Sequence, residues 1–299
     1  MQRIVPNLWF DGNAQEAVEF YASAFPNGEI ISTEYYPKTA EEGLADFQKN
    51  LAGKVLTIEF RLGDLEFVAV NAGPEFKPNA SISIMVNFDP SRDAQARENL
   101  DNLWGKLIDG GKALIEIGEH PFSKRYGWVQ DKYGFTWQLI LTNPDGEPRP
   151  QMIPSLLFGG TAQNRAEEAI NFYTKLFSDA KLGTFVPYPE DHLPVKKGSV
   201  MFADFMLAEQ WFAAMDSAVE QSFSFNEALS LSVACKDQAE IDALWSKLST
   251  VPEAEQCGWC KDAYGVSWQI VPDNMQELMK RPDAFKKLMA MKKLVIADF

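Results

Sequence analysis

GWVQDKYGFTWQLI, residues 127–140, returns near the other end of the chain as GWCKDAYGVSWQIV, residues 258–271. Three further stretches also occur twice and in the same order: IVPNLWF (4–10) with MIPSLLF (152–158), VLTIEFRLGDLEFVAVN (55–71) with VMFADFMLAEQWFAAMD (200–216), and SISIMV (81–86) with ALSLSV (228–233). Six of the eight tryptophans fall into three equivalent pairs. Ordered recurrence of whole segments is the mark of an internal repeat, so the chain is a tandem duplication.

The two copies are separated by NPDGEPRP, residues 143–150, which combines Pro, Gly and charge and has no hydrophobic period. Such a composition is typical of a linker. We therefore divide the chain into a first domain (1–146), a second domain (151–272) and a C-terminal extension (273–299). In the extension, apolar residues at helical spacing on both sides of Pro282 predict two short helices.

Each copy shows the same order of predicted elements. The apolar run 4–10 predicts a strand, and Asn13 and Glu16 after it have the spacing of a helix N-cap and its N3 acid. Asp237 and Glu240 have the same spacing before a helix in the second copy. Alternating and helical patterns then continue in each half, and they predict two strand–helix–strand–strand–strand units per half. The predicted fold class is α+β.

Composition narrows the classes of function. The 299 residues include 28 Lys+Arg against 42 Asp+Glu, a net charge of −14. Nucleic acids and anionic membranes are recognised by basic surfaces, so we expect neither as a partner. No apolar run approaches the ~20 residues that span a bilayer, and polar residues interrupt the N-terminal region before any signal-peptide core. The three cysteines are too few for a disulfide framework, and we expect a cytoplasmic protein.

The repeated motifs resemble a known family. P-x-L-W-F-D-G-N-A-x-E-A-V-E-F-Y near the start of the chain, and G-W-x-x-D-x-x-G-x-x-W-Q-[IL] in both copies, are similar to the PhnB-like branch of the vicinal oxygen chelate superfamily. That superfamily includes glyoxalase I, extradiol dioxygenases and bleomycin-resistance proteins. The resemblance covers nearly the whole chain. It implies a tandem of glyoxalase-like domains, each with two βαβββ modules that form an open cup of mainly antiparallel sheet around a ligand.

Domains of this branch often carry the label demethylubiquinone 3-methyltransferase. A methyl donor's binding fold uses a Gly-rich nucleotide loop after a strand, and neither half contains one. The sequence therefore does not support methyl transfer.

Catalytic members of the superfamily bind a divalent metal through His and Glu on the cup strands. The resemblance places those ligands at Pro6 or Asn7, Ser81 and Gln138 in the first copy, and at Pro154 or Ser155, Ala228 and Gln269 in the second. Proline and alanine have no ligating side chain, and a neutral amide is a poor ligand for a transition metal. We therefore expect no cofactor and disfavour a divalent metal.

A cup that binds a small organic molecule needs a few polar groups among apolar walls. Glutamines lie in the last predicted strand of each copy, two tryptophans lack an aromatic counterpart in the other copy, and an Asn and an Asp end equivalent strands. On this basis we predict small-molecule binding through Gln138, Gln269, Asn71, Asp216, Trp9 and Trp211.

Two other functions stay open at this point. A metal-dependent lyase, isomerase or oxygenase would draw on Glu59 and Asp204, which occupy equivalent positions in a predicted strand. A structural or interaction module would have cups filled by its own side chains. Single-domain relatives commonly pair, so the second copy is expected to supply that partner within one chain. The chain would then be a monomeric pseudo-dimer, with a homodimer as the alternative.

Overall fold

A computed structural model describes residues 2–299. The first half contains β1 (Ile4–Phe10), α1 (Ala14–Ala24), β2 (Glu29–Tyr35), β3 (Val55–Leu62), β4 (Leu65–Asn71), β5 (Ile82–Phe88), α2 (Ala96–Ile108), β6 (Lys112–His120), β7 (Ser123–Gln130) and β8 (Thr136–Leu141). The second half contains β9 (Met152–Phe158), α3 (Ala166–Leu176), β10 (Lys181–Pro187), β11 (Val200–Leu207), β12 (Gln210–Asp216), β13 (Leu229–Cys235), α4 (Gln238–Leu248), β14 (Trp259–Lys261) and β15 (Ser267–Pro272). The extension adds α5 (Met275–Leu278) and α6 (Ala284–Ala290), on either side of Pro282 as predicted.

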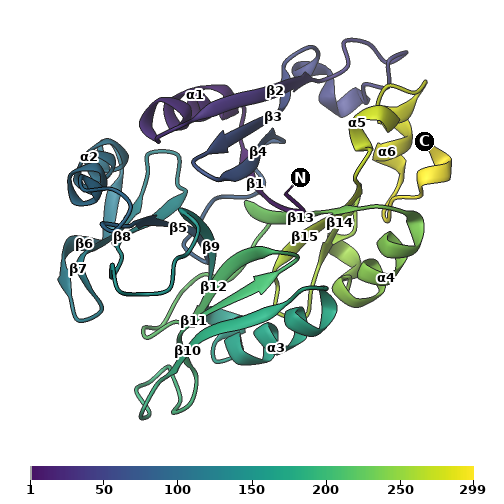
Figure 1. Ribbon diagram of the computed structural model, residues 1–299. Coiled ribbons are helices and arrows are strands. Elements are labelled where there is room, and N and C mark those ends of the chain that lie inside the picture. Colours follow the sequence, from purple (N-terminus) through teal and green to yellow (C-terminus); the bar gives the residue numbers. More distant parts are fainter. Residues whose placement is uncertain (1) are drawn as a thin grey trace.

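Over residues 2–299 the strands form two sheets (Figure 1). Sheet A has seven strands in the order β14-β15-β13-β1-β4-β3-β2, and sheet B has eight in the order β10-β11-β12-β9-β5-β8-β7-β6. Sheet A thus joins the first module of the first half to the last module of the second half, and sheet B joins the two middle modules. The predicted α+β fold of βαβββ modules is confirmed. The sequence did not predict that each sheet would take one module from each half.

Antiparallel pairs of opening strands make the two joins. In sheet A, β1 pairs with β13 and Asn7 lies opposite Ser230; in sheet B, β5 pairs with β9 and Ser83 lies opposite Ser155. These residues are equivalent in the repeat, so an approximate twofold relation connects the two joins. A residue on one sheet can therefore be compared directly with its counterpart on the other.

The last module is one strand shorter than predicted within the described chain. Residues 252–254 form a 3₁₀ turn where the other modules have a strand. The extension lies at this edge, since the backbone N–H groups of Cys257 and Gly258 donate to the carbonyls of Met291 (2.8 Å) and Lys292 (2.7 Å). The C-terminal extension is thus integrated into the edge of sheet A.

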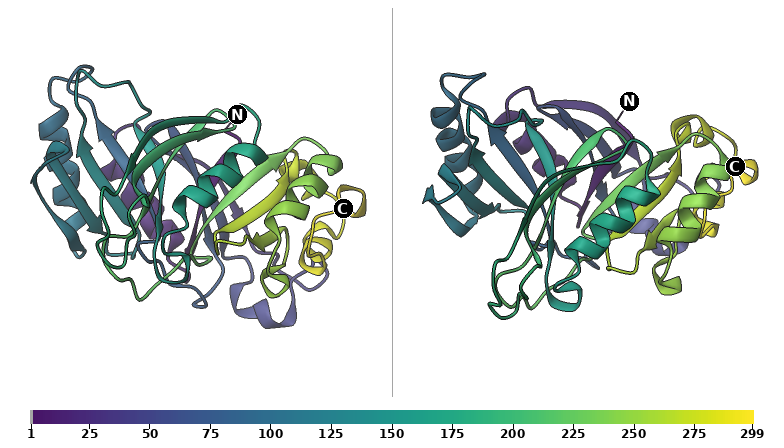
Figure 2. Two further views of the ribbon diagram at one scale, coloured as in Figure 1. Left: turned by 90° about the horizontal axis from the view of Figure 1, so that it is seen from below. Right: turned by 60° about the horizontal axis from the view of Figure 1, so that its bottom comes forward.

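The extension also reaches the opposite end of the same sheet. Phe285 of α6 packs against Tyr36 and Leu44, which belong to the segment between β2 and β3. Figures 1 and 2 show this segment and the C-terminal helices side by side. The extension therefore bridges the two modules of sheet A, one from each half of the chain.

Two buried clusters hold the modules of each half together across the sheets. Asp131 accepts hydrogen bonds from Tyr21 Oη (2.7 Å) and Trp137 Nε1 (2.8 Å), although Tyr21 belongs to α1 beside sheet A and Trp137 to sheet B. The second half repeats this arrangement with Tyr173, Asp262 and Trp268. One of the three tryptophan pairs, Trp137 and Trp268, is thus part of the scaffold in both halves.

Helix capping differs between the first and last modules of the chain. The Asp237 side chain accepts from Glu240 N (2.9 Å) at the start of α4, as predicted. At the start of α1, however, the Asn13 side chain makes no cap hydrogen bond; Asn71 Oδ1 accepts from Ala14 N (3.0 Å) instead. A residue distant in sequence has replaced the local cap.

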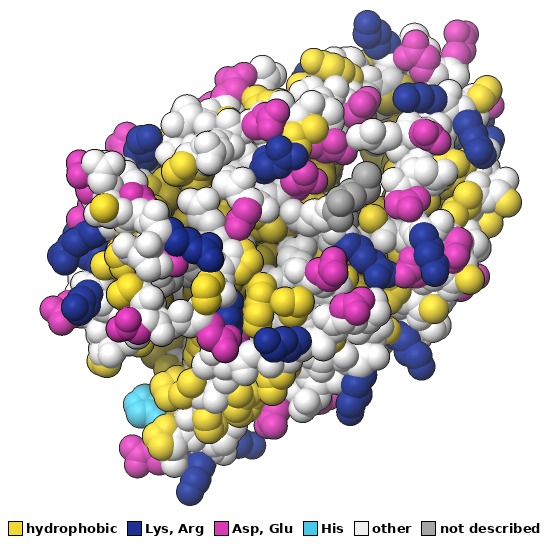
Figure 3. Space-filling view, viewed as in Figure 1, with side chains coloured by type: hydrophobic (Ala, Val, Ile, Leu, Met, Phe, Trp, Pro, Cys, Tyr) yellow, Lys and Arg dark blue, Asp and Glu magenta, His cyan; other side chains and the backbone are white. Residues whose placement is uncertain are grey.

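No helix in residues 2–299 combines the length and the apolar character needed to cross a membrane. On the face shown in Figure 3, acidic and basic side chains are intermingled rather than separated into fields of one sign.

Candidate functional site

Alternation along the strands decides which predicted residues share a face. Side chains such as Leu8 and Phe10 on β1, or Trp137 and Leu139 on β8, point to the core beneath the helices, so their neighbours point to the other face. We call that other face cup A on sheet A and cup B on sheet B. Of the predicted ligand contacts, Trp9 and Gln269 lie in cup A, and Gln138 and Trp211 lie in cup B.

The centre of cup B is a closed hydrogen-bonded cluster. Gln138 is 1% exposed; its Oε1 accepts from Tyr126 Oη (2.7 Å), and its Nε2 donates to Ser83 Oγ (2.7 Å) and Ser155 Oγ (3.4 Å). The Tyr126 ring packs with Trp128 and other apolar side chains. Every polar group of the Gln138 amide is therefore engaged within the protein, whereas the neighbouring Trp128 Nε1 is buried and has no hydrogen-bond partner within residues 2–299.

A linker residue closes the mouth of cup B. Arg149 Nε donates to Asp204 Oδ2 (2.8 Å), and the guanidinium lies 4.0 Å from the centre of a Trp211 ring. The Arg149 and Asp204 side chains are only 14% and 8% exposed. A Cβ at Gly183 would overlap both Asp204 Oδ1 and the Trp211 ring, so only glycine fits beside this cluster. The predicted contact Trp211 is thus covered by the chain's own arginine.

Cup A has a polar floor of neutral side chains. Gln269 Nε2 donates to Ser230 Oγ (3.0 Å), and Asn7 Nδ2 donates to Ser232 Oγ (3.0 Å) and Val5 O (2.8 Å). Within residues 2–299 no hydrogen bond reaches Gln269 Oε1 or Asn7 Oδ1. Unlike its counterpart Gln138, Gln269 is partly exposed. Cup A therefore has two acceptors without a donor, one on the partly exposed Gln269 and one on Asn7, which is only 5% exposed.

Aromatic side chains stand beside this floor. The Trp9 ring lies 5.8 Å from the Trp259 ring and 5.0 Å from the Phe76 ring, edge to face in both cases. Its Nε1 donates to Gly73 O (2.7 Å), which fixes the indole against the segment after β4. Trp9 is therefore a rigid wall of cup A.

Asn71 and Asp216 do not lie in either cup. Each lies an even number of residues after a core phenylalanine on the same strand, Asn71 after Phe67 and Asp216 after Phe212. Their side chains therefore point to the helix side of their sheets. Asp216 is 2% exposed and accepts from the backbone N–H groups of Ala166 (3.2 Å) and Val200 (2.9 Å); burial raises its pKa, and these hydrogen bonds oppose the rise. Like Asn71, it caps the helix of its module. The structure thus corrects the expectation that these two residues line the ligand site.

Glu59 and Asp204 do face the cups, but in different sheets. Glu59 of β3 accepts from Ser32 Oγ (2.9 Å) and from Gln276 Nε2 of α5 (3.1 Å), whereas Asp204 of β11 pairs with Arg149. They therefore do not form one carboxylate pair. Among the described residues, no group of three or more His, Cys, Asp or Glu side chains is placed to hold a metal ion. The donors at the floor of cup A are amides and hydroxyls, a poor set for a transition metal.

The aspartates of the scaffold clusters are equally committed. Burial raises the pKa of Asp131 and of Asp262, and each accepts four hydrogen bonds, from a Tyr hydroxyl, a Trp indole and two backbone N–H groups. Both lie on the helix side, away from the cups. Their role is to hold the two modules of each half together.

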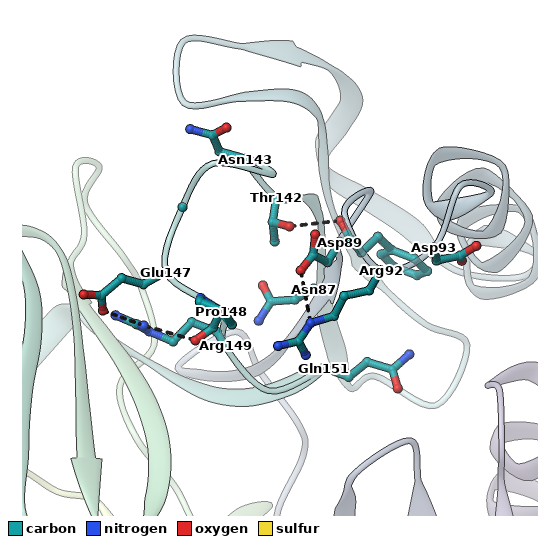
Figure 4. Close-up of a pocket in the computed structure, with 12 residues that line it drawn as sticks. Asn87, Asp89, Arg92, Asp93, Thr142, Asn143, Glu147, Pro148, Arg149 and Gln151 are labelled. Atoms are coloured by element: carbon teal, nitrogen blue, oxygen red, sulfur yellow. Dashed lines mark hydrogen bonds and ion pairs between the residues drawn. The ribbon is translucent and has the colours of Figure 1, made fainter.

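A separate cavity of about 290 Å³ lies beside the linker, between Arg92, Glu147 and Gln151 (Figure 4). Figure 4 shows the Glu147–Arg149 pair on one side of it and the Asp89–Arg92 pair on the other. Neither this cavity nor a second one near Arg3 and Asp273 borders Gln138 or Gln269. The first cavity nevertheless includes Arg149, and it also includes Asn87, which alternates with the core residues Val86 and Phe88 and so lies on the cup side of sheet B.

Sequence reasoning missed three residues that define the cups: Tyr126, Arg149 and Ser230. Tyr126 directly precedes the repeated Gly-Trp, where the second copy has Cys257. This difference between the two copies could have pointed to Tyr126 as a residue that distinguishes the cups. Arg149 gave none, because an arginine in a polar linker has the pattern of a solvated residue.

Two sheets built from paired modules, each with helices on one face and a cup on the other, define a glyoxalase-like protein. Glyoxalase I from Zea mays has this fold: it matches 92% of this chain and 93% of its own with a TM-score of 0.52 at 14% identity. The chain belongs to the 3-demethylubiquinone-9 3-methyltransferase family, whose profile matches residues 2–140 and 150–271, the PhnB-like branch of the vicinal oxygen chelate superfamily.

Shorter solved structures match about half of the chain. The PhnB protein from Bacillus cereus is 33% identical over 47% of this chain and 100% of its own, with a TM-score of 0.39. A protein from Pseudomonas aeruginosa is 22% identical over 48% of this chain and 98% of its own, also with a TM-score of 0.39. No curated protein matched the chain.

Proposed function

We propose that the protein binds a small organic molecule in cup A. The observation that carries this proposal is the pair of free acceptors, Gln269 Oε1 and Asn7 Oδ1, in side chains whose amide nitrogens are already fixed. A ligand donor that reaches a preorganised acceptor gains a hydrogen bond without ordering the protein further. Cup A therefore offers a ligand the glutamine acceptor that Tyr126 occupies in cup B.

The chemistry of cup A favours a neutral ligand. Its floor consists of uncharged amides and hydroxyls, and Trp9 and Trp259 supply apolar walls. Small-molecule sites generally combine a few fixed polar groups with apolar and aromatic surroundings. The closed centre of cup B, with Gln138 fully bonded, argues that only one cup of the two binds.

Two equivalent substitutions test which cup is used. Val70 lies beside Trp9 in sheet A, and Met215 is its repeat counterpart in sheet B; both are partly exposed. Val70→Trp fills cup A, and Met215→Trp is the matched control in cup B. A set of neutral, oxygen-bearing fragments, followed by ligand-observed NMR, should bind wild type and Met215→Trp but not Val70→Trp.

Native mass spectrometry of freshly purified protein provides a second readout, since a retained ligand should be lost from Val70→Trp alone. The proposal is wrong if no fragment binds wild type, or if the fragments bind Val70→Trp as well as they bind wild type.

A further inference from the structure

The C-terminal extension crosses the opening of cup A. Val271 on β15 points into this cup, because it alternates with the core residue Ile270, and it packs in one cluster with Leu278 of α5. Gln276 Nε2 donates to Glu59 on the cup side of β3 (3.1 Å). In sheet A, β15 and β3 are four strand spacings apart, roughly 19 Å along the sheet. A contact made so soon after the end of β15 therefore spans the opening of the curled sheet.

The other end of this crossing rests on the opposite arm of sheet A. Phe285 of α6 packs against Tyr36, in the segment between β2 and β3. Met279 belongs both to this cluster and to the cluster that contains Val271. Figure 1 shows α5 and α6 between the strand pair β2–β3 and the strand pair β14–β15. Residues 273–290 thus bridge the mouth of cup A from one arm to the other.

This bridge is held less firmly than the chain that follows it. Residues 280–283, between α5 and α6, are exposed, and α5 has only four residues. After the bridge, the carbonyls of Met291 and Lys292 accept from the edge of sheet A, and Leu294 is fully buried. Segments with few buried contacts open locally at a low cost in free energy. The bridge therefore has a fixed end and a span that can open.

The bridge also lies beside the acceptor that carries the proposed function. Val271 follows Gln269 on the cup side of β15, and neither of the two cavities described above borders Gln269. Among the described residues no donor reaches Gln269 Oε1. The space in which a ligand would meet this oxygen is therefore narrowed by the protein's own C-terminal chain.

We infer that residues 273–290 are an autoinhibitory lid, which rests on cup A when the cup is empty and moves off it when a ligand binds at Gln269. This inference rests on the proposed function and adds its regulation. Lid and ligand compete for the same space. The apparent dissociation constant is then the intrinsic one divided by the fraction of molecules whose lid is open.

The accessibility of a thiol placed under the lid tests the inference without any ligand. Val68 is the neighbour of Glu59 and of Asn7 on the cup side of sheet A, and Met215 lies in cup B. Val68→Cys and the control Met215→Cys are treated with iodoacetamide. Peptide mass spectrometry then follows each introduced thiol separately from the three native cysteines.

Three substitutions in the lid should change the rate at Val68→Cys in known directions. Gln276→Glu sets a second carboxylate against Glu59 and should raise the rate about threefold, whereas Gln276→Lys should lower it about threefold, the size of effect that exposed charge pairs have. Phe285→Ala removes the contact with Tyr36 and should raise the rate about tenfold or more. The rate at Met215→Cys should stay unchanged in all three, which separates opening of the lid from global unfolding.

The fragments used for the proposed function then show whether the lid competes with a ligand. Neutral, oxygen-bearing fragments should bind Phe285→Ala more tightly than wild type, by the factor by which the thiol rate rises. Equal thiol rates with and without Phe285→Ala would overturn the lid, and so would faster modification without tighter binding. If the thiol rates rise as expected and no fragment binds even Phe285→Ala, the proposed function is wrong, although the extension does cover cup A.

Discussion

Cup A and cup B descend from the same modules but treat the same glutamine differently. In cup B a tyrosine occupies the Gln138 carbonyl and a linker arginine covers the mouth; in cup A the Gln269 carbonyl is free and partly exposed. The scaffold beneath is nearly identical, down to the Tyr–Asp–Trp cluster in each half. The two halves thus share the same scaffold clusters, but the two cups differ: cup B is closed and cup A is open.

The segments that follow the two halves show the same contrast. The linker after the first half brings Arg149 to Asp204 in cup B, and the extension after the second half brings Gln276 to the equivalent Glu59 in cup A. The first contact is a nearly buried ion pair, whereas the second is an exposed hydrogen bond from a neutral amide to a carboxylate. We call the linker the strap of cup B and the extension the strap of cup A. Only the strap of cup B is held by a nearly buried ion pair.

The largest expected effect tests the shared frame. Asp131→Asn removes the charge and turns an N–H₂ group toward two donors, Tyr21 Oη and Trp137 Nε1. Hydrogen bonds to charged groups contribute about 1.5–3 kcal/mol each, so the loss of two should lower the free energy of unfolding by about 4 kcal/mol. Asp262→Asn should cost the same within about 1 kcal/mol. Urea denaturation measures both, and a clear difference between them would show that the halves are not equivalent scaffolds.

The next effect concerns the strap of cup B. Arg149→Ala leaves the Asp204 carboxylate nearly buried without its cation, and breaking such a pair should lower the free energy of unfolding by about 3 kcal/mol. Adding Asp204→Ala should restore part of the loss, because the unpaired charge is gone. An Arg149→Ala protein as stable as wild type would mean that the linker does not hold cup B closed.

A smaller effect is expected at the closed glutamine. Tyr126→Phe keeps the ring but leaves the buried Gln138 Oε1 without a donor, at a cost of about 1–2 kcal/mol. Cys257→Ser, at the equivalent position, should change stability by less than about 0.5 kcal/mol, since no comparable network depends on it. Thermal unfolding of both variants compares them, and equal losses would argue against the difference between the cups.

The smallest effect is expected at the strap of cup A. Gln276→Ala removes an exposed hydrogen bond to Glu59, so stability should change by less than about 0.5 kcal/mol. Hydrogen exchange of α5 should nevertheless become faster, because fewer contacts then hold this short helix. A stability loss near that of Arg149→Ala would show that both straps are equally firm.

Much of the fold could be predicted from the sequence because it depends on local patterns. The repeats, the hairpins, the cap at Asp237 and the break at Pro282 each reflect a few neighbouring residues. The pairing of modules across the halves was not available, since all four modules present the same apolar pattern and nothing local distinguishes one partner from another.

The candidate site was predictable only in part. Gln138 and Gln269 lie off the core side of their strands, and a count of alternate residues from Phe67 or Phe212 would have placed Asn71 and Asp216 under the helices. The side chains that separate the cups, Tyr126 and Arg149, reach them from another strand and from the linker. Their contacts depend on tertiary structure, which a single sequence does not show.

A crystal structure of the protein soaked with the neutral, oxygen-bearing fragments tests the central claim most directly. The account predicts a fragment against Trp9 and Trp259 in cup A, with a donor group within hydrogen-bonding distance of Gln269 Oε1, and Tyr126 still bonded to Gln138 in cup B. A fragment bound in cup B, with cup A vacant, would contradict it.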